Sequence, residues 1–219
     1  MTTATVDDVV VRRLADSDYA TVRDAMIAFT AARDARSVDE IWLVEHAPVY
    51  TFGQAGRPEH LREATDIPVV RTERGGQITY HGPGQAVAYL LVDLKRRGLK
   101  VRAFVSLIED AVIETLAAYN RVASTRPGAP GVYVERDGEL QKIAALGLKI
   151  AGGRSFHGVS LNVAMDLSPY DAIDACGYPG LRTVDLRSLG VDAAVEAVGA
   201  RLADALIVGL ARASREAGR

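Results

Sequence analysis

Short apolar runs separated by turn residues dominate the first three quarters of this chain and narrow its possible folds. Runs typical of β-strands lie at 9–11, 41–46, 49–52, 68–72, 77–80, 86–94, 131–134 and 156–163, with one more around Lys142. Two helical patterns lie between these strands, one beginning near Ser17 or Asp18 and one running from Val101 to Tyr119. This alternation predicts an α+β fold in which helices flank a mixed, largely antiparallel sheet.

A third helical pattern closes the chain. Between Val191 and Arg212, apolar residues recur at helical spacing, and they are Val191, Val195, Val198, Leu202, Leu206 and Leu210. We expect residues 1–219 to form a single domain, because a chain of this length with 48% hydrophobic residues can bury one sizeable core. Within it, residues 166–219 are expected to form a small C-terminal lobe.

Charge and hydropathy exclude several classes of protein. The formal net charge is −2, so nucleic acid is not expected as the main partner. No run of about 18 apolar residues could span a membrane, and the N-terminus lacks the apolar segment of a signal peptide. We therefore expect a soluble, cytoplasmic protein that does not act on membranes.

The stretch from Lys142 to Cys176 carries the candidate chemistry. Cys176 is the only cysteine, so it cannot form an intramolecular disulfide. Lys142 lies in an apolar run, where burial lowers the pKa of an amine. A thiol and an amine both need lowered pKa values to act near neutral pH, and together they suggest a nucleophile and its base.

Each of the two residues also has an ordinary structural interpretation. A lone cysteine is most often a small buried hydrophobic residue, and a lysine in a strand can reach water from a sheet edge. The context favours chemistry for Cys176, because two glycines and a proline within the next four residues predict an open loop.

A second informative stretch runs from Arg74 to Gln85, where four glycines and a proline bracket a short β segment. Glycine allows close backbone approach, so this stretch could surround a bound group; two ordinary hairpin loops explain it equally well. It lacks the features of a phosphate loop or a dinucleotide fingerprint. The four histidines are widely spaced and show no metal-ligand pairing, so no metal site is expected.

Four segments in order resemble one family: RGGQITYHGPGQ, KIAALGL, SFHGVSLNV and MDLSPYDAIDACGY. Together with APVYTFGQAG upstream, they are similar to the lipoyl(octanoyl) transferases, which move an octanoyl group from acyl carrier protein to protein lysines. The resemblance covers the chain from about Glu45 to Gly180. One position departs from it, because Ala175 stands where the family commonly has proline directly before the cysteine.

The resemblance implies a fold shared with biotin protein ligases and lipoate ligases. It implies that Cys176 carries the octanoyl group as a thioester, while Lys142 lowers the pKa of Cys176 and moves protons. The implied substrate-binding residues are Arg74, Gly75, Gly76, Gln77, Ile78, Thr79, Tyr80, His81, Ala145, Leu146, Gly147, His157, Gly158, Val159 and Ser160. No cofactor is implied.

The implied partners are octanoyl-acyl carrier protein as donor, and as acceptors the lipoyl domains of 2-oxoacid dehydrogenase E2 subunits and the glycine cleavage H protein. Two other classes remain open. A lipoate or biotin ligase on the same fold would adenylate its acid and require ATP. A non-catalytic binding module would keep Cys176 buried and slow to alkylate.

A basic cluster offers a docking hypothesis for an acidic carrier protein. Residues 95–102 hold five positive charges and no acid, which is typical either of a docking patch or of a solvated loop. If this cluster docks the carrier protein, replacing Arg96 and Arg97 with Glu should raise KM for the carrier protein. Lys149 and Arg154, nearer to the catalytic stretch in sequence, form the competing patch.

Overall fold

The computed structural model describes residues 9–15, 17–175 and 180–217 of the chain. Its strands are β1 (Val9–Arg13), β2 (Asp39–Val44), β3 (Val49–Phe52), β4 (Val69–Arg71), β5 (Ile78–His81), β6 (Gln85–Leu91), β7 (Ser124–Thr125), β8 (Val132–Arg136), β9 (Glu139–Ala151) and β10 (Arg154–Asn162). Its α-helices are α1 (Tyr19–Ala32), α2 (Val101–Ala117) and α3 (Val195–Ala217), and 3-10 helices lie at Pro58–His60, Ser168–Ala172 and Arg187–Leu189. Every strand and helix expected from the sequence is present within a few residues of its expected position.

The strands pair into two sheets in the part of the chain that the structure describes. The main sheet has the order β1-β2-β6-β10-β9-β8-β7, and a smaller sheet has the order β4-β3-β5. Neighbouring strands run antiparallel except for the parallel pairs β1–β2 and β3–β4. This arrangement confirms the predicted α+β fold with a mixed, largely antiparallel sheet.

Two tight turns fix the register of the central strands. Asp137-Gly138 joins β8 to β9, and Gly152-Gly153 joins β9 to β10, with positive φ at all four residues. Two residues with positive φ match the twist of antiparallel strands, so each of these turns forms a hairpin. The register that results pairs Gly147 with Gly158 across β9 and β10.

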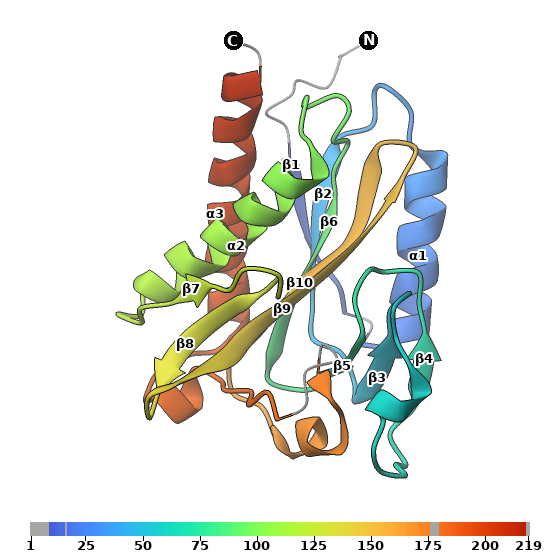
Figure 1. The fold of residues 1–219 in the computed structure, drawn as a ribbon. Helices are drawn as coiled ribbons and strands as arrows, with labels where there is room; N and C mark the ends of the chain where they lie inside the picture. The colour runs from blue at the N-terminus through green and yellow to red at the C-terminus, as the bar shows by residue number, and fades with distance from the viewer. Residues whose placement is uncertain (1–8, 16, 176–179, 218–219) are drawn as a thin grey trace.

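Helices cover both faces of the main sheet (Figure 1). On one face, α2 and α3 bury side chains such as Phe104 and Leu206 in the largest core cluster. On the other face, α1 packs Val22 and Met26 against Trp42 and other residues of the sheet. Helix α1 is capped by Asp18, whose carboxylate accepts the Thr21 N–H at 2.8 Å, as the sequence suggested.

The segment after β10 packs mainly against the smaller sheet. Tyr170, Ile173 and Ala175 share a third core cluster with residues of β3 and β5. Helix α3, in contrast, belongs to the largest core. The small lobe expected at 166–219 therefore stays a prediction, and the packing divides that range between two cores.

The C-terminal helix begins four residues later than its apolar pattern suggested, at Val195. Gly190 has φ of 79°, and the Val191 N–H donates to Leu186 O at 3.0 Å, so this backbone closes a turn first. Strand β7 was not expected, because its two exposed residues carry no apolar pattern. Among the described residues, no helix combines the length and the apolar character needed to cross a membrane.

Two of the five cations in the basic cluster, Arg96 and Arg97, form buried ion pairs. Arg97 donates to Asp39 at 2.5 Å with its side chain 0% exposed, and Arg96 donates to the same carboxylate at 2.7 Å. Arg33 also binds Asp39, which is completely buried. The charges of Arg96 and Arg97 thus face inward to Asp39, and docking of a carrier protein by the cluster stays a prediction. Lys95, Lys100 and Arg102 remain exposed.

Candidate active site

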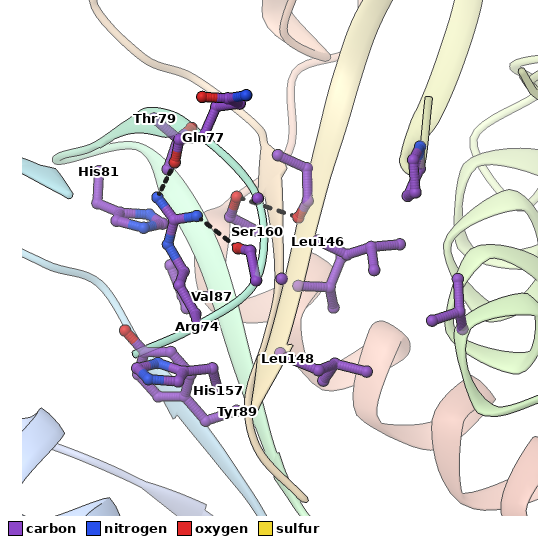
Figure 2. Close-up of a pocket in the computed structure, with 18 of the residues that line it drawn as sticks. Arg74, Gln77, Thr79, His81, Val87, Tyr89, Leu146, Leu148, His157 and Ser160 are labelled. Atoms are coloured by element: carbon purple, nitrogen blue, oxygen red, sulfur yellow. Dashed lines mark hydrogen bonds between the residues drawn. The ribbon is translucent and has the colours of Figure 1, made fainter. Parts of the chain in front are cut away.

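A cavity of about 350 Å³ lies where the predicted motifs meet, a size typical of small-molecule sites. It is lined from β5, β6, β9, β10, the segment 74–77, the start of α2 and the loop 128–130. Figure 2 shows Arg74, His81, His157 and Tyr89 to one side of β9, with Leu146 and Leu148 projecting from its other side. The site thus combines a polar wall with an apolar one.

The structure brings together nearly all of the residues predicted to bind substrate. The cavity is lined by Arg74, Gly75, Gly76, Gln77, Ile78, Thr79, His81, Ala145, Leu146, Gly147, His157, Gly158, Val159 and Ser160. Tyr80 is not among the lining residues. Its ring packs with Tyr50 and Tyr170 in the cluster of the smaller sheet, because side chains alternate between the two faces of β5.

Arg74 organises the loop that precedes β5. Its buried guanidinium donates to the carbonyl oxygens of Gly75 and Gln77, each at 2.9 Å, and to Thr51 O at 2.6 Å. These bonds tie the loop to β3. The sequence suggested a ligand-binding arginine, whereas the structure shows an arginine that also shapes the cavity wall.

Glycines allow the loop and the strands to approach closely. The Gly75 N–H donates to Leu148 O at 2.9 Å, which lays the loop across β9. A Cβ at Gly147 would lie 2.8 Å from Gly75 O, and a Cβ at Gly158 would lie 2.0 Å from Ala88 O. Larger side chains at these positions would separate the walls of the cavity, which accounts for the glycines of both motifs.

Lys142 also lines the cavity and is 3% exposed. Its Nζ donates to Pro130 O at 2.9 Å and lies 5.2 Å from the centre of the Tyr133 ring. Gly131, with φ of 132°, leaves room for this side chain, since a Cβ there would lie 2.5 Å from Lys142 Cε. The sequence placed Lys142 in an apolar strand, and the structure confirms its burial.

Cys176 lies outside the described residues, but the chain on both sides of it is anchored near Lys142. Ala175 and Lys142 line the same small hollow, together with Thr79 and Thr183. After the gap, the Lys142 N–H donates to Arg182 O and the Val184 N–H donates to Lys142 O, both at 2.9 Å. The residue directly before the predicted nucleophile thus neighbours the predicted base.

Histidines and tyrosines form the polar wall. His46 donates from Nδ1 to Ser17 O at 2.9 Å, and its Nε2 lies 2.7 Å from the Tyr89 hydroxyl. His81 donates from Nδ1 to Gln85 Oε1 at 2.7 Å. Tyr19 stacks on His81 with ring centres 5.9 Å apart. Within the described residues, no group of His, Cys, Asp and Glu side chains is arranged to hold a metal ion.

His157 and Glu73 form a polar pair at the edge of this wall. His157 donates from Nε2 to Glu73 Oε1 at 2.7 Å, and Arg23 also binds Glu73, at 2.8 Å. The hydrogen bond from His157 lowers the pKa of Glu73 to about 2, while burial lowers the pKa of His157 below its usual 6.5. Both shifts favour a neutral imidazole beside a carboxylate at neutral pH.

We expect acid to destabilise the protein through His81. Burial lowers the pKa of His81 to about 3, and the positive charge of Arg74 acts in the same direction. Below pH 6.5, His81 binds a proton in the unfolded chain but stays neutral in the folded protein. Acid therefore favours the unfolded chain, and the free energy of unfolding decreases as the pH falls from 6.5 toward 3. The free energy of unfolding should fall by about 2 kcal/mol between pH 7.5 and 5.

Urea unfolding at several pH values measures this loss. His81→Gln should flatten the pH dependence, although His157 contributes with the same sign. The matched control is His60→Gln, because His60 lies away from the cavity and is partly exposed. An equal slope in wild type and His81→Gln would contradict the assignment.

Several lining residues were not expected from the sequence. They are Tyr19, Val87, Tyr89, Val101, Val105, Gly128, Ala129, Pro130 and Leu148. Val101 and Val105 lie within the predicted helix from Val101 to Tyr119, and Tyr89 lies within the predicted strand 86–94. For Val87 and Tyr89, the sequence offers one indication: residues two apart in a strand point to the same face of the sheet, so these two side chains face the cavity together.

Comparison with known proteins places this chain in a family. Residues 18–207 match the family described as "Lipoyl protein ligase A/B catalytic domain". An octanoyltransferase of Aromatoleum aromaticum is 58% identical over 90% of this chain and 84% of its own length. One from Cupriavidus necator is 62% identical over 84% of this chain and 70% of its own length.

Solved structures support the fold. A bipartite lipoate protein ligase from Thermoplasma acidophilum superposes with a TM-score of 0.69 at 16% identity, over 94% of this chain and 83% of that one. At this identity the likeness concerns the fold alone. Taken with the curated relatives and the family match, it leads to one assignment: this chain is an acyltransferase of the lipoyl protein ligase A/B catalytic domain family and belongs to the octanoyltransferases.

Proposed function

We propose that this enzyme transfers an octanoyl group from octanoyl-acyl carrier protein to a lysine of lipoyl domains through a thioester on Cys176. The observation that carries the proposal is the position of Lys142, a buried lysine that lines both the cavity and the small hollow it shares with Ala175. The names of the relatives support octanoyl as the transferred group.

The apolar wall suits a saturated acyl chain. Leu146 and Leu148 from β9 and Val101 and Val105 from α2 line this side of the cavity. Burying a chain of methylenes there contributes about 0.8 kcal/mol for each CH₂ removed from water. This binding energy is available to hold the thioester carbonyl near Lys142 while the reaction proceeds.

The first half-reaction moves the acyl group onto the enzyme. The Cys176 thiolate attacks the thioester carbonyl carbon, the bond to the carrier sulfur breaks, and the Lys142 ammonium protonates the departing thiolate. The products are the Cys176 thioester, the free carrier thiol and a neutral Lys142.

The second half-reaction delivers the acyl group. The neutral ε-amine of the acceptor lysine attacks the Cys176 thioester, and Cys176 leaves as thiolate. Lys142 takes the surplus proton, which restores the starting pair of thiolate and ammonium. The acceptors proposed are lipoyl domains of 2-oxoacid dehydrogenase E2 subunits and the glycine cleavage H protein. The lipoate ligase from Thermoplasma acidophilum is described with its E2 lipoyl domain, which supports this class of acceptor.

Thr79 is a candidate donor to the oxyanion that forms in both half-reactions. Its Oγ1 is buried and has no hydrogen-bond partner among the described residues, and it lines both the cavity and the hollow beside Lys142. A donor held in such a water-poor site stabilises developing charge without reorganising. Backbone amides of the glycine-rich segments are the other candidates.

Intact-mass spectrometry after incubation with octanoyl-acyl carrier protein tests the proposal. We expect wild type to gain one octanoyl group without ATP, and Cys176→Ser to gain none under conditions in which its fold is retained. Adding a lipoyl domain should remove the adduct and acylate the domain. An adduct on another residue would contradict the nucleophile, and a strict requirement for ATP with free octanoate would indicate a ligase.

A further inference from the structure

A buried carboxylate and Lys142 bind opposite sides of the same peptide group, the one between Pro130 and Gly131. Glu109 is on α2 and is 9% exposed. Its Oε1 accepts the N–H of Gly131 at 2.9 Å. The carbonyl of the same peptide group, Pro130 O, accepts from Lys142 Nζ at 2.9 Å. One amide therefore links the carboxylate to the lysine.

The peptide group between them is held on both sides. Tyr133 donates from its hydroxyl to Ala129 O at 3.0 Å, which fixes the residue before Pro130. Proline at 130 has no N–H and a restricted φ, so Pro130 is itself a stiff element of the loop. Gly131 adopts φ of 132°, which turns the chain into β8 and leaves space for Lys142 Cε. Glu109 thus anchors the segment at the point where it meets the lysine.

Hydrogen bonds in series strengthen one another. When an amide N–H donates to a carboxylate, the oxygen of that amide carries more negative charge. This oxygen then binds an ammonium group more strongly than it binds a neutral amine. Burial of Lys142 acts in the opposite direction, because it favours the neutral amine. The negative charge of Glu109 acts against burial, because a nearby anion favours the ammonium form.

We propose that Glu109 is a positioning residue for Lys142 and acts through the Pro130–Gly131 peptide, which it fixes in place and polarises. This inference rests on the proposed function only in the role of Lys142 as proton donor and base. The contact itself belongs to the folded chain, so it can be tested without any acyl donor.

The direct test is a titration of Lys142 by NMR in chain labelled with ¹³C-lysine. The sequence contains four lysines, at 95, 100, 142 and 149, and Lys142→Arg identifies the ε-methylene signal of Lys142 by its loss. A Cys176→Ser background removes the charge of the proposed thiolate, and Tyr133 remains as another titratable group facing Lys142.

In this background, Glu109→Gln should lower the pKa of Lys142 by about 0.5 to 1 unit, because an amide oxygen can still accept from Gly131 but carries no charge. The matched control is Glu114→Gln, which removes a carboxylate from the exposed side of the same helix and should leave the pKa of Lys142 unchanged. An equal pKa in wild type and Glu109→Gln would overturn the proposal.

Kinetics in the chain with Cys176 intact supply a second readout. Glu109→Ala should lower kcat for octanoyl transfer about 10-fold and Glu109→Gln about 3-fold, with KM for the carrier protein unchanged. Glu109→Gln keeps the test valid if Glu109→Ala fails to fold.

The outcomes separate this inference from the function it builds on. If Lys142→Ala is inactive while Glu109→Gln has both the pKa and the kcat of wild type, the positioning role is wrong and the proposed function stands. If Lys142→Ala retains full activity, the proposed function is wrong, and the titration alone still decides whether Glu109 acts on Lys142.

Discussion

Replacing Lys142 with alanine should lower the rate of octanoyl transfer by about 10²- to 10⁴-fold, the range typical of losing a general acid–base group. The proposed function gives Lys142 two roles: its charge would stabilise the Cys176 thiolate, and its proton would go to the leaving group. Lys142 is buried and lines the same small hollow as Ala175. The midpoint pH for alkylation of Cys176 should rise in the same variant, since removing a nearby cation disfavours the thiolate. Single-turnover acylation and iodoacetamide kinetics measure the two effects.

Two further variants sharpen this test. Lys142→Arg should retain part of the alkylation shift and still lose turnover, because a guanidinium does not release a proton at accessible pH. Lys149→Ala removes another lysine of β9 that does not line the cavity. With a small octanoyl thioester as donor, which avoids docking of the carrier protein, this variant should leave both measurements unchanged. An unchanged alkylation midpoint in Lys142→Ala would argue against the pairing of Lys142 with Cys176.

The largest effect on stability is expected from Asp39. Its completely buried carboxylate binds Arg33, Arg96 and Arg97 and accepts the Asp93 N–H at 2.8 Å. Asp39→Asn keeps the size of the side chain but leaves three guanidinium groups without their counter-charge. Removing one partner of a buried ion pair costs about 3 to 5 kcal/mol, so the free energy of unfolding should fall by that amount.

Urea unfolding at pH 7.5 compares this variant with Glu59→Gln. Glu59 forms an ion pair with Arg57 at 3.9 Å in which both side chains are exposed, and such pairs contribute about 0 to 1 kcal/mol. If Asp39→Asn lowers the free energy of unfolding by less than about 1 kcal/mol, the Asp39 network behaves like a solvent-exposed ion pair and the prediction is wrong. By the same reasoning, reversing the charge of Arg96 or Arg97 would harm folding before it could report on carrier docking.

The sequence alone was sufficient for the fold class and for most of the cavity wall. Strand and turn patterns are local, so the positive-φ turn at Asp137-Gly138 and the apolar alternation of β10 could be recognised without tertiary information. The segments RGGQITYHGPGQ and KIAALGL carried a family resemblance that the relatives confirm. The role of Cys176 stays a prediction.

Tertiary packing decided what local pattern could not. The chain from 95 to 102 had the composition of a docking patch, yet Asp39, 58 residues before Arg97, holds that arginine inside the protein. Tyr80 was expected in the cavity because it lies within a motif, and alternation along β5 turned its ring to the smaller sheet.

Lys142 likewise has one property that the local sequence predicted and others that only the tertiary structure decided. Its burial followed from its apolar neighbours, but its hydrogen bond to Pro130 and the link through Gly131 to Glu109 join three segments that meet only in the folded chain. Sequence patterns fix which way a side chain faces within one strand or helix. The partner it meets there depends on the order of strands in the sheet and on which helix covers them, and those are properties of the whole fold.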